Sequence, residues 1–183
     1  MSDRRVRLKK GLSGEELIRF CKRYITDGSF LDVFSIDNID YKLIKQRIAK
    51  GKTTSCIINT SKADEKGEHW VGVYFPKDGG DCEYFDSFGF PPLQTATQRL
   101  CEMSVTGDYS WNEEYPIQDV LDESSVSCGW HVLFYLYAKH EKPGMKLGDL
   151  VREYYSDWDF RRNDLFSTRD LPSLKWSGLY IKI

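Results

Sequence analysis

Long apolar runs are missing from this sequence of 183 residues. No stretch approaches the roughly 18 apolar residues of a membrane-spanning helix, so no membrane contact is expected. The first residues lack the apolar segment of a signal peptide, which argues against secretion. Histidine is scarce, with three in the chain, and no Cys-x-x-Cys occurs. We therefore expect no zinc site, no other metal and no cofactor.

The cysteines do not form a disulfide pattern. There are five of them, an odd number, at the irregular positions 21, 56, 82, 101 and 128. Free thiols are typical of proteins from a reducing compartment, where disulfides are rare. We therefore expect an intracellular protein.

The composition is that of a globular protein, with 40% hydrophobic and 14% aromatic residues. The length suits one domain with its own core, which we place at residues 1–183. A net charge of −2 gives no overall attraction to nucleic acid. Residues 1–11 are nevertheless predicted to form a solvated basic tail, with a weak tendency to touch a polyanion. Its basic residues are Arg4, Arg5, Arg7, Lys9 and Lys10.

Periodicity and turn signals predict an irregular mixture of helices and strands. Ser13 and Glu16 have the spacing of a capping box, and Gly28 is placed to end the helix that they begin. Residues 29–38 are expected to form a loop, and residues 107–117 are strand-like or irregular. Further helices are expected near 40–50, 91–101, 128–138 and 147–154, and strands near 53–60, 69–75 and 82–88.

The stretch 127–138 stands out because residues 130–138 are apolar or aromatic with one exception, His131. A helix of this kind is buried on nearly every side. Cys128 would lie in its first turn, where the positive end of the helix dipole favours the thiolate, the nucleophilic form of cysteine. The alternative is a core cysteine that acts as a small hydrophobic residue. A nucleophile also needs a base and a group that orients the base.

The two strands at 69–75 and 82–88 supply such a pair. If Phe75 lies opposite Gly80 in an antiparallel hairpin, then His69 lies opposite Asp86, with the Cβ atoms about 5 Å apart. A carboxylate beside an imidazole fixes its tautomer, as in a catalytic triad. The alternative is a cross-strand ion pair without a catalytic role, and spacing alone favours neither.

Gln118 lies ten residues before Cys128 in a loop that must return to the start of the central helix. A side-chain amide there, together with the backbone N–H of Cys128, could bind the oxyanion of a tetrahedral intermediate. A glutamine in a loop is otherwise most often a solvent-exposed residue.

Four motifs in this order resemble the family of the adenovirus protease, adenain, and its relatives in virus-like DNA transposons. The motifs are Gly67–Trp70 (Gly-Glu-His-Trp), Tyr84–Phe90 (Tyr-Phe-Asp-Ser-Phe-Gly-Phe), Ile117–Gln118, and Ser127–Gly129 (Ser-Cys-Gly). The resemblance covers residues 29 to 140. The more distant ubiquitin-like-protein proteases share the His-Trp, Asp, Gln and Cys order without the Phe-Gly-Phe.

The resemblance implies an α+β fold, in which a mixed β-sheet packs against helices and the cysteine begins the buried central helix. It implies that Cys128 is the nucleophile, His69 the general base, Asp86 the orienting acid and Gln118 the oxyanion donor. Adenoviral enzymes usually carry Glu where this chain has Asp86.

By the same resemblance, the chain is expected to be a cysteine endopeptidase that cleaves after small, glycine-like residues. It would mature proteins of a DNA virus or virus-like element, in the host nucleus, the cytoplasm or the virion, and act as a monomer. A viral peptide and DNA are activators in the family, but this chain has no cysteine from 102 to 127 to hold such a peptide by a disulfide. Two alternatives stay open: an isopeptidase that removes ubiquitin or a ubiquitin-like protein, and a protease-like binding module without turnover.

Overall fold

A computed structural model describes residues 7–8, 11–113, 115–121, 126–155 and 180–181. The central element is a five-stranded sheet with the strand order β2-β3-β4-β5-β6. The strands are β2 (Phe30–Ser35), β3 (Thr54–Asn59), β4 (Trp70–Phe75), β5 (Cys82–Phe85) and β6 (Tyr109–Trp111). The outer pairs β2–β3 and β5–β6 are parallel, whereas β3–β4 and β4–β5 are antiparallel. The sheet is therefore mixed, as expected for the α+β class.

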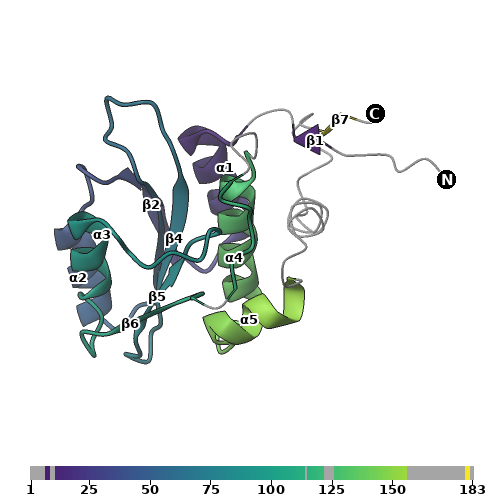
Figure 1. Cartoon of the computed structure of the whole chain (residues 1–183). Helices are drawn as coiled ribbons and strands as arrows, with labels where there is room; N and C mark the ends of the chain where they lie inside the picture. The colour runs from purple at the N-terminus through teal and green to yellow at the C-terminus, as the bar shows by residue number, and fades with distance from the viewer. Residues whose placement is uncertain (1–6, 9–10, 114, 122–125, 156–179, 182–183) are drawn as a thin grey trace.

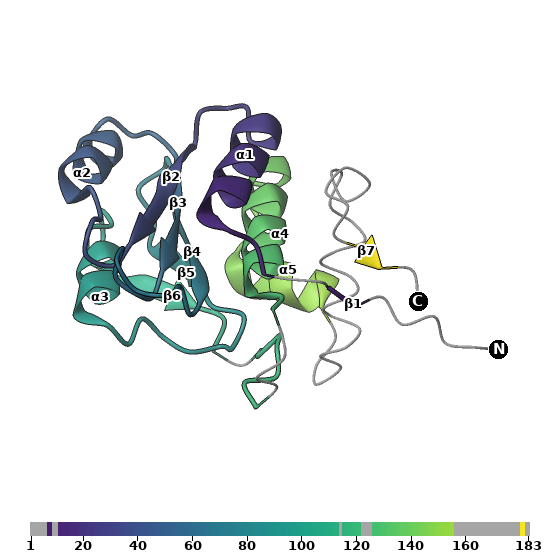
Figure 2. The ribbon, with the colours of Figure 1, turned by 90° about the horizontal axis from the view of Figure 1, so that it is seen from above.

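Helices cover both faces of the sheet, which gives three layers (Figures 1 and 2). The helices are α1 (Gly14–Tyr24), α2 (Tyr41–Ala49), α3 (Thr95–Cys101), α4 (Cys128–Glu141) and α5 (Leu147–Tyr154). One core contains residues of α1, α4 and α5 together with Ile57, Tyr74 and Phe85 of the sheet. The other core contains residues of α2 and α3 with their neighbours on the strands, such as Ile58 and Val73. Alternate strand residues thus face opposite cores, as the pleat requires.

The central helix α4 lies against β4 and is buried almost all round. Ten of its residues are buried, including Trp130, His131 and Tyr135. Gly72 of β4 makes the close approach possible, because a Cβ at this position would lie 3.1 Å from Cδ1 of Tyr135 and 3.3 Å from Cγ1 of Val132. The predicted buried helix beginning at Cys128 is confirmed.

The hairpin formed by β4 and β5 has a different register from the predicted one. Val73 pairs with Tyr84 and Tyr74 with Glu83, so the connection is the six-residue stretch 76–81 instead of four residues. Gly79 has a φ of 81° in this turn, a conformation that glycine adopts without strain. A shift of two positions preserves which residues share a face. The predicted direct opposition of His69 and Asp86 is therefore wrong, but the prediction that they lie on one side is not.

Residues 29–38 were expected to form a loop, and this prediction is also wrong, because they contain β2. This strand is at the edge of the sheet and each of its residues is only partly buried. Asp32 in its centre interrupts the apolar alternation by which a strand is recognised. The capping box of Ser13 and Glu16 is confirmed, although α1 ends at Tyr24, four residues before Gly28.

The two ends of the described chain meet in a short antiparallel pair, β1 (Arg7–Leu8) with β7 (Tyr180–Ile181). Most of the predicted basic tail, residues 1–6 and 9–10, lies outside the described residues. Among the helices that the structure describes, none has both the length and the apolar character to cross a lipid bilayer.

Candidate active site

Cys128 is the first residue of α4 and follows Ser127, which occupies the N-cap position. It is partly exposed, whereas the other four cysteines of the chain are buried. The backbone N–H groups of a first helical turn have no partners within the helix and carry the positive end of its dipole. This position suits a thiol that reacts as its anion.

His69 and Asp86 are in contact, as the sequence predicts. His69 directly precedes β4, Asp86 directly follows β5, and Nε2 of the imidazole donates to Oδ1 of the carboxylate at 2.8 Å. The side chains are 13% and 6% exposed. The pair is thus shielded from water, at the ends of the inner strands β4 and β5.

A clamp of hydrogen bonds fixes the position of Asp86. Asn112, immediately after β6, accepts from the backbone N–H of Asp86 at 3.1 Å and donates from Nδ2 to its carbonyl at 2.7 Å. The backbone N–H of Phe88 donates to the same Oδ1 that receives His69, at 2.8 Å. The carboxylate therefore keeps its orientation when the imidazole moves.

The imidazole of His69 is held on its other sides by an aromatic ring and a thiol. The ring of Phe88 stacks on it, with the centroids 4.4 Å apart and the planes 19° from parallel. Burial lowers the pKa of His69, but hydrogen bonds and charge interactions with Asp86 and Cys128 outweigh burial and raise the pKa to about 9. The imidazole is therefore protonated at neutral pH, next to a thiol.

Gln118 is buried, with 3% of its surface exposed, and is not the solvated loop residue that glutamine usually is. The hydroxyl of Ser87 donates to its Oε1 at 2.8 Å. The backbone N–H groups of Ile117 and Gln118 both donate to the carbonyl of Ser87, at 2.8 and 2.9 Å. The hydrogen bond from Ser87 therefore fixes the orientation of the Gln118 amide.

The indole of Trp70 packs against Leu12 and against the start of α4. Its Nε1 donates to the carbonyl of Leu12 at 3.0 Å. A Cβ at Gly129 would lie 3.2 Å from Cδ1 of the indole, so the glycine after Cys128 lets the start of α4 approach this ring. Trp70 thus holds the helix start beside His69, since the two residues are consecutive in the chain.

Two residues of this arrangement, Ser87 and Asn112, are not candidates from the sequence. Ser87 follows Asp86 directly, and its contact with Gln118 depends on the path of the loop that carries Gln118. Asn112 has no spacing signal that connects it with Asp86. Within the described residues, no group of three or more His, Cys, Asp or Glu side chains is placed to bind a metal ion.

The sequence matches no family model and no curated protein. Solved structures do share the fold. The ASFV pS273R protease superposes with a TM-score of 0.59 at 18% identity, over 86% of this chain and 66% of that protein. ChlaDub1 from Chlamydia trachomatis superposes with a TM-score of 0.58 at 14% identity, over 90% of this chain and 91% of that protein.

These identities establish the fold alone. The chain spans slightly less than two thirds of the length of the ASFV protease, whereas it matches ChlaDub1 over nearly its whole length. The predicted α+β class, a mixed sheet with the central helix beginning at Cys128, is therefore confirmed by the structure and by its neighbours.

Proposed function

We propose that this protein is a cysteine protease, with Cys128 as nucleophile, His69 as the residue that exchanges the proton, Asp86 as its orienting partner and Gln118 as an oxyanion donor. One observation carries the proposal. A largely shielded imidazole bonded to a carboxylate at 2.8 Å also interacts with the thiol that begins a buried helix. A lone core cysteine has neither a base nor an orienting group.

In the proposed reaction Cys128 attacks as its thiolate, the nucleophilic form of a thiol, with the imidazolium of His69 beside it. The sulfur of Cys128 attacks the carbonyl carbon of the substrate, and the electron pair of the C=O bond moves to the oxygen. The amide of Gln118 and the backbone N–H of Cys128 donate to this oxyanion. When the intermediate collapses, the C–N bond breaks and the imidazolium gives its proton to the leaving amine. The acyl group stays on sulfur as a thioester, and His69 is neutral.

Hydrolysis of the thioester restores the site. Neutral His69 takes a proton from water, and the hydroxide attacks the thioester carbonyl. Collapse of this second intermediate expels the thiolate of Cys128 and releases a carboxylic acid. Asp86 does not take up a proton at either step, because its role is to hold the imidazole and stabilise its positive charge.

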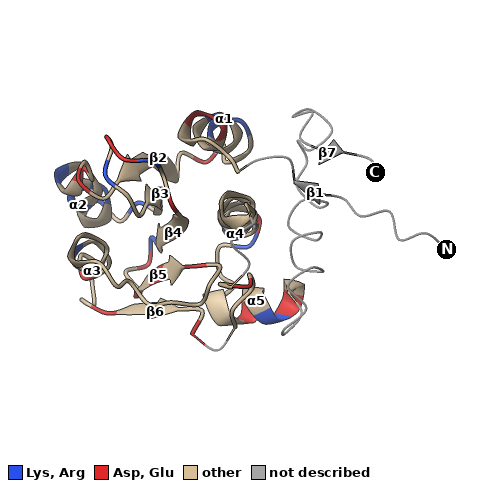
Figure 3. Cartoon of the chain, turned by 45° about the horizontal axis from the view of Figure 1, so that its top comes forward, with Lys and Arg blue, Asp and Glu red and all other residues tan. Residues whose placement is uncertain are grey.

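The proposed substrates are proteins cut after small, glycine-like residues, among them the precursors of a virus or virus-like element. The alternative is removal of ubiquitin or a ubiquitin-like protein from a lysine side chain. Activation by DNA is a weaker part of the proposal, since acidic and basic residues are interspersed along α1 and α5, and α2 is the one of these surface helices with basic residues alone (Figure 3). An intracellular location and a monomeric state remain proposals of the same kind.

Cleavage assays with a matched pair of variants test the proposal. The wild type, Cys128→Ala and Cys21→Ala are assayed on a fluorogenic Gly-Gly peptide and on a ubiquitin-like protein joined to lysine, with and without DNA. Cys128→Ala should retain less than about a thousandth of the wild-type rate, because the covalent nucleophile is lost. Cys21→Ala, which removes a buried thiol of α1, should keep the rate.

The assays separate the alternatives. Retention of more than about a tenth of the rate in Cys128→Ala would remove the nucleophile assignment. Cleavage of the lysine-linked fusion in preference to the peptide would favour the isopeptidase. A folded wild type that cleaves neither substrate, and whose Cys128 is not alkylated by iodoacetamide before the other cysteines, would support the binding module.

A further inference from the structure

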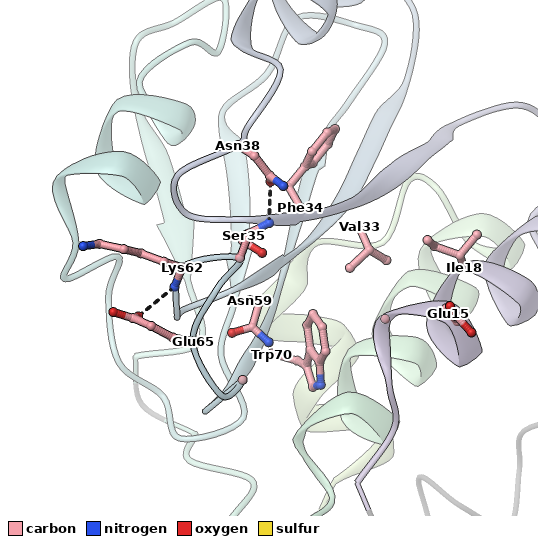
Figure 4. A pocket seen from close by; sticks show the side chains of 13 residues that line it. Glu15, Ile18, Val33, Phe34, Ser35, Asn38, Asn59, Lys62, Glu65 and Trp70 are labelled. Carbon is pink, nitrogen blue, oxygen red and sulfur yellow. Dashed lines mark hydrogen bonds between the residues drawn. The ribbon is translucent and has the colours of Figure 1, made fainter.

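A groove of about 300 Å³ opens beside Trp70, away from the thiol. Its walls come from four places: the start of α1, the end of β2, Asn59 at the end of β3, and the turn formed by residues 62–67 (Figure 4). None of these segments carries a residue of the proposed catalytic mechanism. The groove is nevertheless next to the site, since Trp70 follows His69 in the chain.

The indole of Trp70 separates the groove from the helix that carries the thiol. A Cβ at Gly129, the residue after Cys128, would lie 3.2 Å from Cδ1 of the indole. A Cβ at Gly14, which lines the groove, would lie 3.6 Å from Cη2 of the same ring. An extended chain advances about 3.3 Å per residue, so a peptide in the groove reaches the far side of the indole within a few residues.

One wall of the groove offers hydrogen-bond donors. The side-chain oxygen of Asn38 accepts from the backbone N–H of Ser35 at 2.7 Å, and that of Asn59 accepts from Ser61 at 2.9 Å. With both oxygens occupied by the backbone, the NH₂ groups are what these side chains present to a ligand. Donors of this kind suit the carbonyl oxygens of an extended peptide.

Beside these amides the lining of the groove is apolar, and the two ends of the groove are acidic. Ile18, Val33 and Trp70 provide the apolar surface, and the carboxylates of Glu15 and Glu65 lie at opposite ends of the groove (Figure 4). Lys62 also lines the groove, but its side chain extends away from the indole (Figure 4). A flexible apolar stem with a positive head, as in lysine and arginine, complements such a surface.

We propose that this groove is a substrate subsite that selects a lysine or arginine a few residues from the cleaved bond. Its stem lies on Ile18, Val33 and Trp70, its charge is met by Glu15 or Glu65, whichever end of the groove it reaches, and the asparagine amides hold the peptide backbone. The subsite rests on the proposed function, because a peptide bound in the groove is a substrate only if Cys128 cleaves it.

A set of peptides tests the selection. Lys, Leu and Glu are placed in turn at each of the five positions on either side of the bond in a Gly-Gly reporter, and kcat/KM is measured. At one of these positions the order should be Lys above Leu above Glu. The Lys-to-Glu ratio should be about tenfold at most, because both carboxylates are exposed to solvent. A profile without a Lys preference at any position overturns the proposal.

Variants assign the preference to the groove. In Glu15→Gln/Glu65→Gln the Lys-to-Glu ratio should fall to below about threefold, because both charges are removed. The glutamine at 65 can still accept from the backbone N–H of Lys62, as Glu65 does at 3.0 Å, so the turn is preserved. Asp64→Asn is the matched control: Asp64 is an exposed acid of the same turn outside the groove lining, and its loss should leave the ratio unchanged. An unchanged ratio in the double variant overturns the proposal.

Binding to Cys128→Ala separates this proposal from the proposed function. Fluorescence anisotropy of the same peptides needs no turnover, and it should show tighter binding of the Lys peptide at the selected position. If the wild type cleaves nothing while this preference is present, the protease proposal fails, and the groove is a binding site for a basic residue but not a substrate subsite. Equal binding of the Lys and Glu peptides overturns the groove assignment, whether or not the wild type is active.

Discussion

Each end of α4 lies beside a charged pair that involves the sheet. The two pairs differ in how completely their polar atoms are hydrogen-bonded. At the C-terminal end, Lys139 is 2% exposed and donates to Glu83 of β5 at 3.0 Å. At the N-terminal end, Cys128 meets the His69–Asp86 pair, whose carboxylate follows the same strand. Both pairs are shielded from water, so burial does not distinguish them.

Completeness of hydrogen bonding does distinguish them. Lys139 also donates to the carbonyl of Met145 and lies 4.5 Å from the centre of the Tyr74 ring, while the other oxygen of Glu83 receives the hydroxyl of Tyr135. At the other end, Nε2 of His69 is bonded to Asp86, whereas the interaction of the imidazole with Cys128 is looser, and its buried Nδ1 has no hydrogen bond of ordinary geometry to a described residue. A saturated pair stabilises the fold, whereas a nitrogen left open beside a thiol is available for proton transfer.

Breaking the saturated pair is expected to have the largest effect on stability. Lys139→Met leaves Glu83 buried without its cation, and removal of one partner of a buried pair costs about 3–5 kcal/mol. The free energy of unfolding, measured in urea, should fall by this amount, while kcat of the folded protein stays near that of the wild type.

The control for this variant is Lys142→Met. Lys142 forms an exposed pair with Glu153 at 2.8 Å, with the side chains 45% and 44% exposed. Its loss should leave the free energy of unfolding nearly unchanged, because solvent screens both charges. If the two lysine variants were equally stable, the saturated pair would have no structural role beyond that of a surface contact.

Asp86→Asn should have the opposite effect to Lys139→Met, with a large loss of activity and a small loss of stability. The kcat/KM value is expected to fall by about 10- to 10³-fold, because the imidazole loses the group that orients it and stabilises its charge. The asparagine oxygen can still accept from the backbone N–H of Phe88, so the clamp persists and the unfolding free energy should fall by only about 1 kcal/mol. A destabilised variant with normal turnover would make His69–Asp86 a structural pair like Lys139–Glu83.

The pH dependence of stability offers a smaller but independent contrast. Burial lowers the pKa of His69, yet Asp86 and Cys128 raise it to about 9 from the ordinary 6.5. A raised pKa stabilises the folded state fully below 6.5, and this contribution is lost as the pH rises through 9. The difference in unfolding free energy between the wild type and Asp86→Asn, measured in urea and on the order of 1 kcal/mol at pH 6, should therefore narrow by pH 9.5. A constant difference would show that Asp86 does not stabilise the imidazolium.

The smallest expected effect is that of Ser87→Ala. The variant removes the hydroxyl that donates to Oε1 of Gln118, so the amide can rotate and spend less time as an oxyanion donor. We expect kcat to fall by about three- to tenfold with KM nearly unchanged, because the lost interaction belongs to the transition state. Ser87→Thr, which keeps the hydroxyl, should restore part of kcat. A rise in KM alone would place Ser87 in substrate binding instead.

Much of the fold could be predicted because the sequence carries local signals for it. The run after Cys128 is too apolar to be anything but a buried helix, and the strand around Ile57 and Ile58 is equally explicit. The strand β2 was missed because Asp32 breaks its alternation at the sheet edge. The β4–β5 register was missed because the number of residues in the turn is not encoded by any single residue in it.

The candidate site divides in the same way. His69 and Asp86 could be paired from the sequence because hairpin pairing preserves the face even when the register moves by two. Their catalytic role, and those of Gln118 and Cys128, stay predictions until the variants are measured. Ser87 and Asn112 could not be found, since each acts through a loop whose path depends on tertiary packing.

Gly72 sets how closely β4 and α4 can pack. The glycine lies three positions after His69 on β4, and it faces Val132, which is one helical turn after Cys128. The distance between β4 and α4 at this point therefore also determines the distance between the imidazole of His69 and the thiol of Cys128. A residue without a side chain sets this distance. His69 precedes the strand and Cys128 begins the helix. The absence of a methyl group at Gly72 lets these two elements pack closely, and so it also fixes how the two side chains are aligned.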